Sequence, residues 1–311
     1  MSKIIINHVM SQDVQSNIYS SIINYFKEFS GSDFQHITTV EPISEASVWH
    51  YHRPHLEKRL KPRSVVTVHH DLSDTDPWLS YEKFHDRYKE SQKIVCLNTQ
   101  QKAYLTAQGI TNTTIIPHGY NRKVFIANEA KQVKEKYTFL VTSRRYGRRV
   151  KGEAYIIDLL KYLDNTHIAF ILVGQDRSLD APYFEKFGFE TKIYDRLPYK
   201  LFNDLYRQSD FLLMPSYFEG GPANIPEAVA TCTPIICNPI GMAADLVQNM
   251  RNGLYLTMDP VTDGENINSL IKSPNKIAEI FANSATQEHS SKAITWEKSI
   301  KANCDIYREI N

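Results

Sequence analysis

Two glutamates with a fixed spacing lie in the segment of this 311-residue chain whose residue types are best suited to bind a ligand. Glu219 and Glu227 are separated by seven residues within MPSYFEGGPANIPEAVATCTP, residues 214–234. Gly220 and Gly221 lie between them, and adjacent glycines let backbone N–H groups approach a ligand without an intervening Cβ. A carboxylate accepts two hydrogen bonds from a vicinal diol, which is what a sugar or a ribose presents. The loop leads into a helix N-terminus, which favours a bound anion.

The elements that must position this loop alternate along the chain as short apolar runs and segments with helical spacing. The runs that we expect to be strands are 4–6, 47–50, 65–68, 94–97, 114–116, 139–141, 168–173, 211–214, 235–237 and 254–256. Near-continuous apolar strands separated by amphipathic helices indicate parallel sheets with helices on both faces. About ten strands are too many for one such sheet, so we expect an α/β protein with two Rossmann-like domains.

The charged stretch NEAKQVKEKY, residues 128–137, lacks a strong apolar stripe and is the expected linker. We therefore predict an N-terminal domain over residues 1–125 and a C-terminal domain over residues 126–292. Ligands of such folds bind at the carboxyl ends of the strands, so the predicted site faces a central cleft.

Composition excludes several classes of protein. Lys plus Arg number 36 and Asp plus Glu number 35, a net charge of +1, which argues against a dedicated nucleic-acid binder. Four cysteines at no metal-ligand spacing are expected to be reduced thiols in a cytoplasmic protein. The N-terminus lacks the features of a signal peptide. No apolar stretch approaches the ~18–20 residues that span a bilayer, although docking at the inner face of the cell membrane stays open.

The segment around the two glutamates resembles the E-x7-E signature of retaining glycosyltransferases of family four, commonly written P-S-x-x-E-G-F-G-x-P-x-x-E-A. The resemblance implies the GT-B architecture, in which two Rossmann-like domains face a central cleft. It also implies that Glu219 contacts hydroxyls of the donor sugar and that Glu227 holds the ribose of the nucleotide. The loop residues expected at the donor are Gly220, Gly221, Asn224 and Ile225. Here G-G-P-A-N stands where the family has G-F-G-L-P, so the backbone contacts with the sugar stay open.

The stretch TSRRYGRRVKG, residues 142–152, resembles the family's G-R-x-x-x-x-K-G segment, in which an Arg and a Lys bind the donor diphosphate. Lys151 matches that lysine. The segment is slightly longer than the usual spacing, so the arginine is ambiguous, and Arg144 and Arg145 are favoured over the two arginines that follow them. Fixed cations there would stabilise the negative charge that builds on a departing diphosphate.

VVTVHHDL, residues 65–72, resembles the family's strand ending in T-x-H-D, whose histidine lies near the donor sugar. Matching by position gives His69 for that role. His70 then stands where the family has Asp, and Asp71 follows one position later.

The rest of the first half departs further from the family, and acceptor recognition is expected there. SQDVQSN, residues 11–17, stands where many members carry a glycine-rich loop. IPHGYNRKVF, residues 116–125, resembles the I-P-N-G-V-D…F turn, and Gly119 is expected to let backbone approach the donor. The histidines of WHYHRPH, residues 49–55, are expected to be structural or to face the acceptor. In the family a C-terminal helix crosses back to the first domain, and residues 293–310 match it.

Asp74 and Asp76 form a D-x-D string, which in glycosyltransferases of the other major fold holds a divalent cation. Here the string precedes Pro77-Trp78 and a helical stretch, so capping of a helix N-terminus is the simpler role. We expect neither a bound metal nor a cofactor.

The resemblance implies transfer of a sugar from a UDP- or GDP-linked donor to a hydroxyl of a glycan, glycolipid or protein acceptor, with retention of anomeric configuration. Such activity would serve the synthesis of cell-surface polysaccharide, glycolipid or protein glycan. In the family the favoured mechanism is front-face displacement, in which the leaving phosphate oxygen takes the acceptor proton. Two alternatives stay open: a non-catalytic glycosyltransferase-like partner or glycan-binding subunit, and a sugar-nucleotide epimerase, which shares the architecture.

Overall fold

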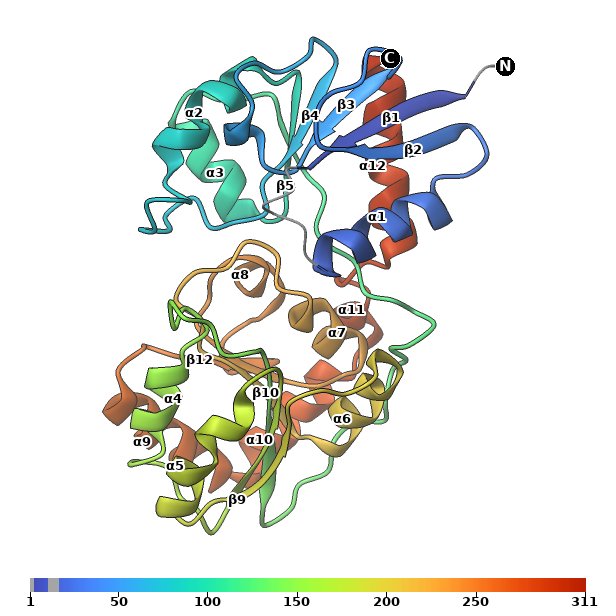
Figure 1. Cartoon of the computed structure of the whole chain (residues 1–311). Coiled ribbons are helices and arrows are strands. Elements are labelled where there is room, and N and C mark those ends of the chain that lie inside the picture. The colour runs from blue at the N-terminus through green and yellow to red at the C-terminus, as the bar shows by residue number, and fades with distance from the viewer. Residues whose placement is uncertain (1–2, 11–16) are drawn as a thin grey trace. The chain divides into compact units, whose positions relative to one another are not determined.

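The computed structural model describes residues 3–10 and 17–311, so most of the predicted first loop, residues 11–16, lies outside the described part. The chain divides into two compact units (Figure 1). The first unit comprises Met1–Gly119, Glu219–Gly221 and Ile294–Asn311, and the second comprises Tyr120–Phe218 and Pro222–Ala293.

The first unit is a six-stranded parallel sheet with the strand order β2-β1-β3-β4-β5-β6. Its strands are β1 (Ile4–Val9), β2 (Phe34–Thr39), β3 (Val48–Tyr51), β4 (Ser64–Thr67), β5 (Lys93–Cys96) and β6 (Thr113–Ile115). Its helices are α1 (Asn17–Phe29), α2 (Tyr81–Glu90), α3 (Thr99–Ala107) and α12 (Trp296–Ile310), with a short 3-10 turn, η2 (Pro54–Leu56).

The second unit is a six-stranded parallel sheet with the order β12-β11-β10-β7-β8-β9. Its strands are β7 (Tyr137–Thr142), β8 (Ile168–Val173), β9 (Glu190–Tyr194), β10 (Phe211–Met214), β11 (Ile235–Cys237) and β12 (Gly253–Tyr255). Its α-helices are α4 (Glu153–Leu159), α5 (Ala181–Lys186), α6 (Phe202–Gln208), α7 (Asn224–Ala230), α8 (Met242–Leu246), α9 (Pro260–Ile271), α10 (Pro274–Ser284) and α11 (Gln287–Ser290). Two 3-10 turns, η3 (Arg177–Asp180) and η4 (Tyr199–Leu201), complete it. Within the described residues, no helix has both the length and the apolar composition needed to cross a membrane.

Each sheet carries an apolar cluster on both faces, because neighbouring residues of a strand point to opposite sides. In the first sheet Val65 packs with side chains of α1 and α12, whereas Val66 packs with those of α2 and α3. In the second sheet Val141 packs with α4, α9 and α10, and Leu140 packs with α7 and α8. The predicted α/β class with two parallel, doubly covered sheets is therefore confirmed.

Two strands of the structure were not predicted from the sequence, and each lies at the edge of a sheet. These are β2, at one edge of the first sheet, and β9, at one edge of the second. Edge strands are covered less completely, so they need no continuous apolar run. Residues of β9 alternate between exposed and half-buried, and those of β2 are mostly half-buried or exposed.

The C-terminal helix α12 completes the core of the first unit, although it is the last element of the chain. Figure 1 shows α12 beside α1, and its residues Ile300 and Tyr307 belong to the apolar cluster on that face of the sheet. The Tyr307 hydroxyl lies 2.6 Å from Nδ1 of His50, a fully buried residue of β3. The other ring nitrogen of His50 lies 2.7 Å from Oγ1 of Thr67.

Removing the Tyr307 hydroxyl is therefore expected to destabilise the first unit. In Tyr307→Phe the ring still fills the core, but Nδ1 of His50 loses its partner in a dry environment, at a cost of about 1–3 kcal/mol. Urea unfolding followed by circular dichroism measures this loss. Tyr183→Phe, at an exposed tyrosine, is the matched control and should unfold as the wild type does. Equal stability of the two variants would contradict the role given to this hydroxyl.

Candidate functional site

Glu227 lies in the first turn of α7, which follows β10, and is a buried carboxylate with only 5% of its surface exposed. The hydroxyls of Tyr199 and Tyr206 donate hydrogen bonds to Oε1 and Oε2, each over 3.0 Å. Burial raises the pKa of Glu227 to about 7, and the two hydroxyl donors limit the rise. The side chain is thus held in one orientation and titrates near neutral pH.

The two tyrosines are functional candidates that sequence reasoning missed. Tyr199 begins η4 and Tyr206 lies in the following helix α6. They are seven residues apart, a spacing that places side chains on the same face over two helical turns. That spacing is the signal that could have found them. The ring of Phe125 packs edge-on against both, with centroids 5.5 and 5.7 Å away, and so supports their orientation.

Glu219, the other predicted glutamate, is 8% exposed and belongs with its two following glycines to the first unit. Its backbone N–H donates to Oδ2 of Asp71 over 3.4 Å. The Nδ2 of Asn98, the residue that caps helix α3, donates to the carbonyl of Gly220 over 2.8 Å. The loop is therefore anchored to residues that follow strands β4 and β5.

The glycines of this loop are required by close packing. A Cβ on Gly220 would lie 2.7 Å from the carbonyl oxygen of His69, and one on Gly221 would lie 2.8 Å from Nδ1 of His118. Gly119 is confined in the same way, because a Cβ there would collide with the backbone nitrogen of Trp296. These three positions are each explained by local packing, whatever further contact they make with a ligand.

Asn224 and Ile225, the other two loop residues expected at the donor, lie in the first turn of α7. The carbonyl of Asn224 accepts a hydrogen bond from the Tyr206 hydroxyl over 3.3 Å. Ile225 is fully buried in the apolar cluster beneath the second sheet. Its side chain therefore serves the core.

The basic loop between β7 and α4 gathers two of the predicted cations around one aromatic ring. The guanidinium of Arg144 lies over the ring of Tyr146, 4.2 Å from its centroid, and Nζ of Lys151 lies 5.6 Å from the same centroid. The backbone N–H of Tyr146 donates to Oε1 of Glu153 over 2.7 Å, which fixes this part of the loop to the start of α4. Gly152, in the left-handed region with φ 79°, forms the turn into that helix.

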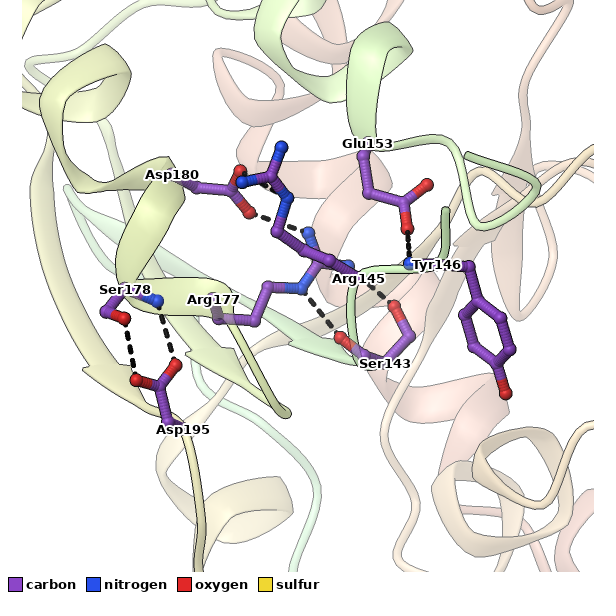
Figure 2. A network of polar contacts seen from close by, with 8 residues as sticks. All are labelled: Ser143, Arg145, Tyr146, Glu153, Arg177, Ser178, Asp180 and Asp195. Atoms are coloured by element: carbon purple, nitrogen blue, oxygen red, sulfur yellow. Dashed lines mark hydrogen bonds and ion pairs between the residues drawn. The ribbon is translucent and has the colours of Figure 1, made fainter. Parts of the chain in front are cut away.

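Arg145 is placed differently from its neighbour. Its Nε lies 3.5 Å from Oδ1 of Asp180, whose other oxygen accepts from Nη1 of the buried Arg177 over 2.9 Å (Figure 2). Arg177 also donates from Nε and Nη2 to the backbone and side-chain oxygens of Ser143, over 2.6 and 2.7 Å. Arg177 and Asp180 thus tie the end of β7 to η3, and Arg145 shares their carboxylate.

His69 follows β4 and is only partly exposed, in the first unit. Its Nε2 lies 2.9 Å from Nδ1 of His52, and its ring lines a small cavity with Thr67 and His118. Burial, followed by the neighbouring ring of His52, lowers the pKa of His69 well below its usual value. The ring is therefore neutral at physiological pH.

The D-x-D string forms two tight turns. Oδ1 of Asp74 accepts from the backbone N–H of Asp76 over 2.9 Å, and Oδ1 of Asp76 accepts from that of Trp78 over 2.7 Å. Both aspartates therefore bond the backbone two residues on, as residues of such turns commonly do.

Three histidines offer nitrogen atoms within 4.8 Å of one another, namely His8, His50 and His52. Their rings are stacked: the centroids of His50 and His52 are 4.4 Å apart at 24°, and those of His8 and His52 are 5.3 Å apart at 20°. A metal ion lies in the plane of each imidazole that binds it, so stacked rings do not converge on one ion. All six ring nitrogens also have hydrogen-bonding partners already.

Comparison with known proteins places this chain among sugar-transferring enzymes. An uncharacterised glycosyltransferase of Methanocaldococcus jannaschii is 23% identical over 274 residues, covering 82% of this chain and 71% of that protein. D-inositol 3-phosphate glycosyltransferase 2 of Catenulispora acidiphila is 30% identical over 105 residues, but the match covers only 33% of this chain and 24% of that protein.

Two solved structures share the fold at 15% identity. Sucrose-phosphate synthase from Thermosynechococcus elongatus superposes with a TM-score of 0.76, covering 98% of each chain. Anabaena HepE, solved in complex with UDP and glucose, superposes with a TM-score of 0.72, covering 98% of this chain and all of that one. Both support the predicted GT-B architecture.

The sequence model of the family described as glycosyl transferases group 1 matches residues 124–288, which is more than half of the chain. The matched stretch contains Glu227, Lys151, and the arginines of the basic loop. The chain therefore belongs to the group 1 glycosyl transferases and is a glycosyltransferase.

Proposed function

We propose that this glycosyltransferase is a retaining enzyme of the E-x7-E type, which moves a sugar from a nucleotide-sugar donor to an acceptor hydroxyl. The observation that carries the proposal is the buried carboxylate of Glu227, held from both sides by Tyr199 and Tyr206. A carboxylate with fixed orientation is suited to accept both hydroxyls of a ribose. We assign the ribose of the donor to Glu227.

The diphosphate is assigned to Arg144 and Lys151, because they lie over the same ring of Tyr146. Two cations held on one rigid aromatic side chain form a preorganised positive site, which stabilises charge as it develops on the leaving group. Arg145 shares Asp180 with Arg177, so we assign it chiefly to shaping this loop.

The sugar is assigned to Glu219 and His69 of the first unit, with Gly119, Gly220 and Gly221 shaping the surrounding backbone. The second unit, with the backbone of Asn224 and Ile225, would bind the nucleotide, and the first would select the acceptor. Two comparisons support a nucleotide-sugar donor for the proposed reaction. The Catenulispora relative is named for glycosyl transfer to an inositol phosphate, and the Anabaena structure holds UDP and glucose. No step of the proposed reaction requires a metal or a cofactor.

A binding screen tests the proposal directly. UDP, GDP, ADP and their sugar conjugates are added separately, and thermal unfolding of the full chain is recorded. A ligand present at 100 times its dissociation constant raises the free energy of unfolding by about 2.7 kcal/mol. We expect one nucleotide series to do so. Binding without turnover would support the non-catalytic alternative, and isomerisation of the donor without acceptor would indicate an epimerase.

The raised pKa of Glu227 predicts that nucleotide affinity depends on pH. A pKa of about 7 leaves most of this group ionised at pH 8 and most of it protonated at pH 6. Affinity for the selected nucleotide should therefore fall by up to about tenfold over that range, because a protonated carboxyl is a weaker acceptor for the ribose. Isothermal titration calorimetry measures this affinity. The variant Glu227→Gln is expected to bind the nucleotide weakly, with the same affinity at pH 6 and pH 8.

The same group predicts a pH dependence of stability. The folded chain binds a proton at Glu227 more readily than the unfolded chain, whose carboxyl has the usual value of 4.5. The free energy of unfolding should therefore fall as pH rises from about 4.5 to about 7. Glu227→Gln should lose this part of the dependence. A variant with the wild-type profile, in both binding and unfolding, would contradict the assigned burial and charge.

Lys151 supplies a prediction on turnover. Removing one preorganised charge from a transition state costs about 2–4 kcal/mol, so Lys151→Ala should lower kcat by about 100-fold with the fold intact. Lys161→Ala is the control, since that exposed lysine pairs with Asp158 on the surface of the same unit. Release of nucleoside diphosphate from the selected donor measures both. Wild-type turnover by Lys151→Ala would remove this lysine from the site.

A further inference from the structure

Three side chains of the first unit carry six buried nitrogen atoms that have no hydrogen-bonding partner in the described part of the chain. They are Nε and Nη1 of Arg53 and both ring nitrogens of His55 and of His70. His70 as a whole is only 5% exposed, and Arg53 and His55 are half-buried. Buried polar atoms of folded proteins are almost always paired, so this group of unpaired atoms needs a physical explanation. We call Arg53, His55 and His70 the arginine cluster.

Two neighbouring strands bring the arginine cluster together. Arg53 and His55 follow β3 and His70 follows β4, and these two strands pair in parallel. The rings of His55 and His70 pack against the ring of Phe84 in α2, with centroids 4.1 and 4.2 Å away. The cluster therefore lies at the carboxyl edge of the first sheet, where ligands of such folds bind.

Arg53 carries a positive charge that no described residue balances. A guanidinium stays protonated in proteins. Among the residues that the structure describes, no carboxylate forms an ion pair with Arg53, and its Cζ lies 5.5 Å from the centroid of the Tyr19 ring. Charges inside proteins are commonly paired, because an isolated charge loses its hydration without compensation. The cluster thus lacks a negative partner.

The two histidines add hydrogen-bond donors to this charge. Burial, followed by the charge of Arg53, lowers the pKa of His55 to about 4, and it lowers that of His70 to about 3. Both rings are therefore neutral at physiological pH, and each has one N–H donor. Lys83 also opposes a charge on His55, so two cations make the potential at that ring positive. Donors in a positive potential are suited to an anion.

The cluster lies next to the surface of the unit. Trp78 packs edge-on against His55, with centroids 5.0 Å apart, and is itself 45% exposed. Nζ of the exposed Lys83 lies 5.6 Å from the centroid of the Trp78 ring. Rotation of the Trp78 side chain would therefore open His55 to solvent without any change in the sheet.

We propose that the arginine cluster binds an anionic group of the acceptor, a phosphate or a carboxylate. The proposal rests on the proposed function, in which the first unit selects the acceptor. Arg53 supplies the charge, and His55 and His70 each donate one hydrogen bond to an oxygen of that group. Hydrogen bonds from a guanidinium to such oxygens are short and strong, so the cluster holds the acceptor by its charged end. The acceptor then belongs to the phosphorylated or acidic hydroxyl compounds, such as sugar phosphates and uronic acids.

Magnetic resonance tests anion binding without donor or acceptor. Inorganic phosphate is titrated at constant neutral pH into the full chain labelled with ¹⁵N-histidine, and the variants His55→Gln and His70→Gln identify the ring signals of the cluster. We expect both signals to move along one saturation curve, while the signal of His167, in the second unit, stays in place. Acetate in place of phosphate shows whether a carboxylate binds as well. Signals of His55 and His70 that stay in place, or move only as that of His167 does, would overturn the site.

Substitutions of Arg53 test its charge. Arg53→Met keeps an unbranched side chain but loses the charge, so affinity for phosphate should fall by about tenfold or more. Arg53→Lys keeps a charge and should retain part of the affinity. Arg63→Met is the matched control, because Arg63 is half-buried in the same unit and lies over the ring of Trp49, but has no buried nitrogen without a partner. Equal affinity in Arg53→Met and Arg63→Met would remove Arg53 from the site.

Thermal unfolding distinguishes a binding role of Arg53 from a structural role. Replacing an unpaired buried charge by an apolar side chain removes its desolvation cost, so in a buffer without phosphate Arg53→Met should unfold at the temperature of the wild type or above it. Phosphate should stabilise the wild type more than the variant, beyond the general effect that this salt has on both. A variant less stable than the wild type without phosphate would assign Arg53 to the fold and overturn the proposal.

Turnover tests whether the bound anion belongs to the acceptor. With the donor selected by the binding screen, sugars and polyols are offered as neutral compounds, as phosphate esters and as carboxylic acids. We expect an anionic form to be the preferred acceptor. Arg53→Met should raise the KM of that acceptor by about tenfold or more with kcat nearly unchanged, because the cluster contacts the charged end and not the reacting hydroxyl. Arg63→Met should keep both constants.

The outcomes separate the two proposals. If the wild type turns over no donor with any acceptor, the proposed function and the acceptor role fail together, while phosphate binding at the cluster is decided by magnetic resonance alone. If the wild type prefers neutral acceptors, or if Arg53→Met keeps the wild-type KM, only the role of the cluster is overturned. If the donor alone displaces phosphate from the cluster, the site belongs to the donor and the acceptor assignment is wrong.

Discussion

Parallel pairing of the strands is the constraint on which the rest of this structure depends. In each described sheet the strands run in one direction, so the residues that follow them gather at one edge. His69 follows β4, Asn98 follows β5, and the loop that holds Glu219 and Glu227 follows β10. The polar groups of the site are therefore brought together within each unit by the sheets, and the loops need only short turns to orient them.

Sequence alone predicts the strands that are buried on both faces, and it misses the strands that are not. Central strands such as β8 and β10 are continuous apolar runs, whereas the edge strands β2 and β9 have no such run and were not predicted. Motif resemblance indicated Glu227 but not its partners Tyr199 and Tyr206. These two tyrosines lie 28 and 21 residues before Glu227 in the sequence, outside the motif. Cys232 has a φ of 57°, a left-handed conformation that costs residues other than glycine roughly 1–2 kcal/mol.

Desolvation shifts the pKa values of buried acids and buried bases in opposite directions, but it favours the neutral form of both. It raises the pKa of Glu227 and lowers those of the buried histidines, so each group moves toward its neutral form. The four cysteines follow the same rule, since they are buried as free thiols and burial raises the pKa of each. Arg177 and Asp180, in contrast, are buried as an ion pair over 2.9 Å.

The position of α12 has a consequence for biosynthesis. A ribosome synthesises this helix after every other described element, yet its side chains fill the core that β1 and α1 begin. The first unit therefore cannot complete its core until the second unit has been synthesised. During synthesis the second unit can therefore complete its core before the first, whose apolar surface stays exposed until α12 has been made.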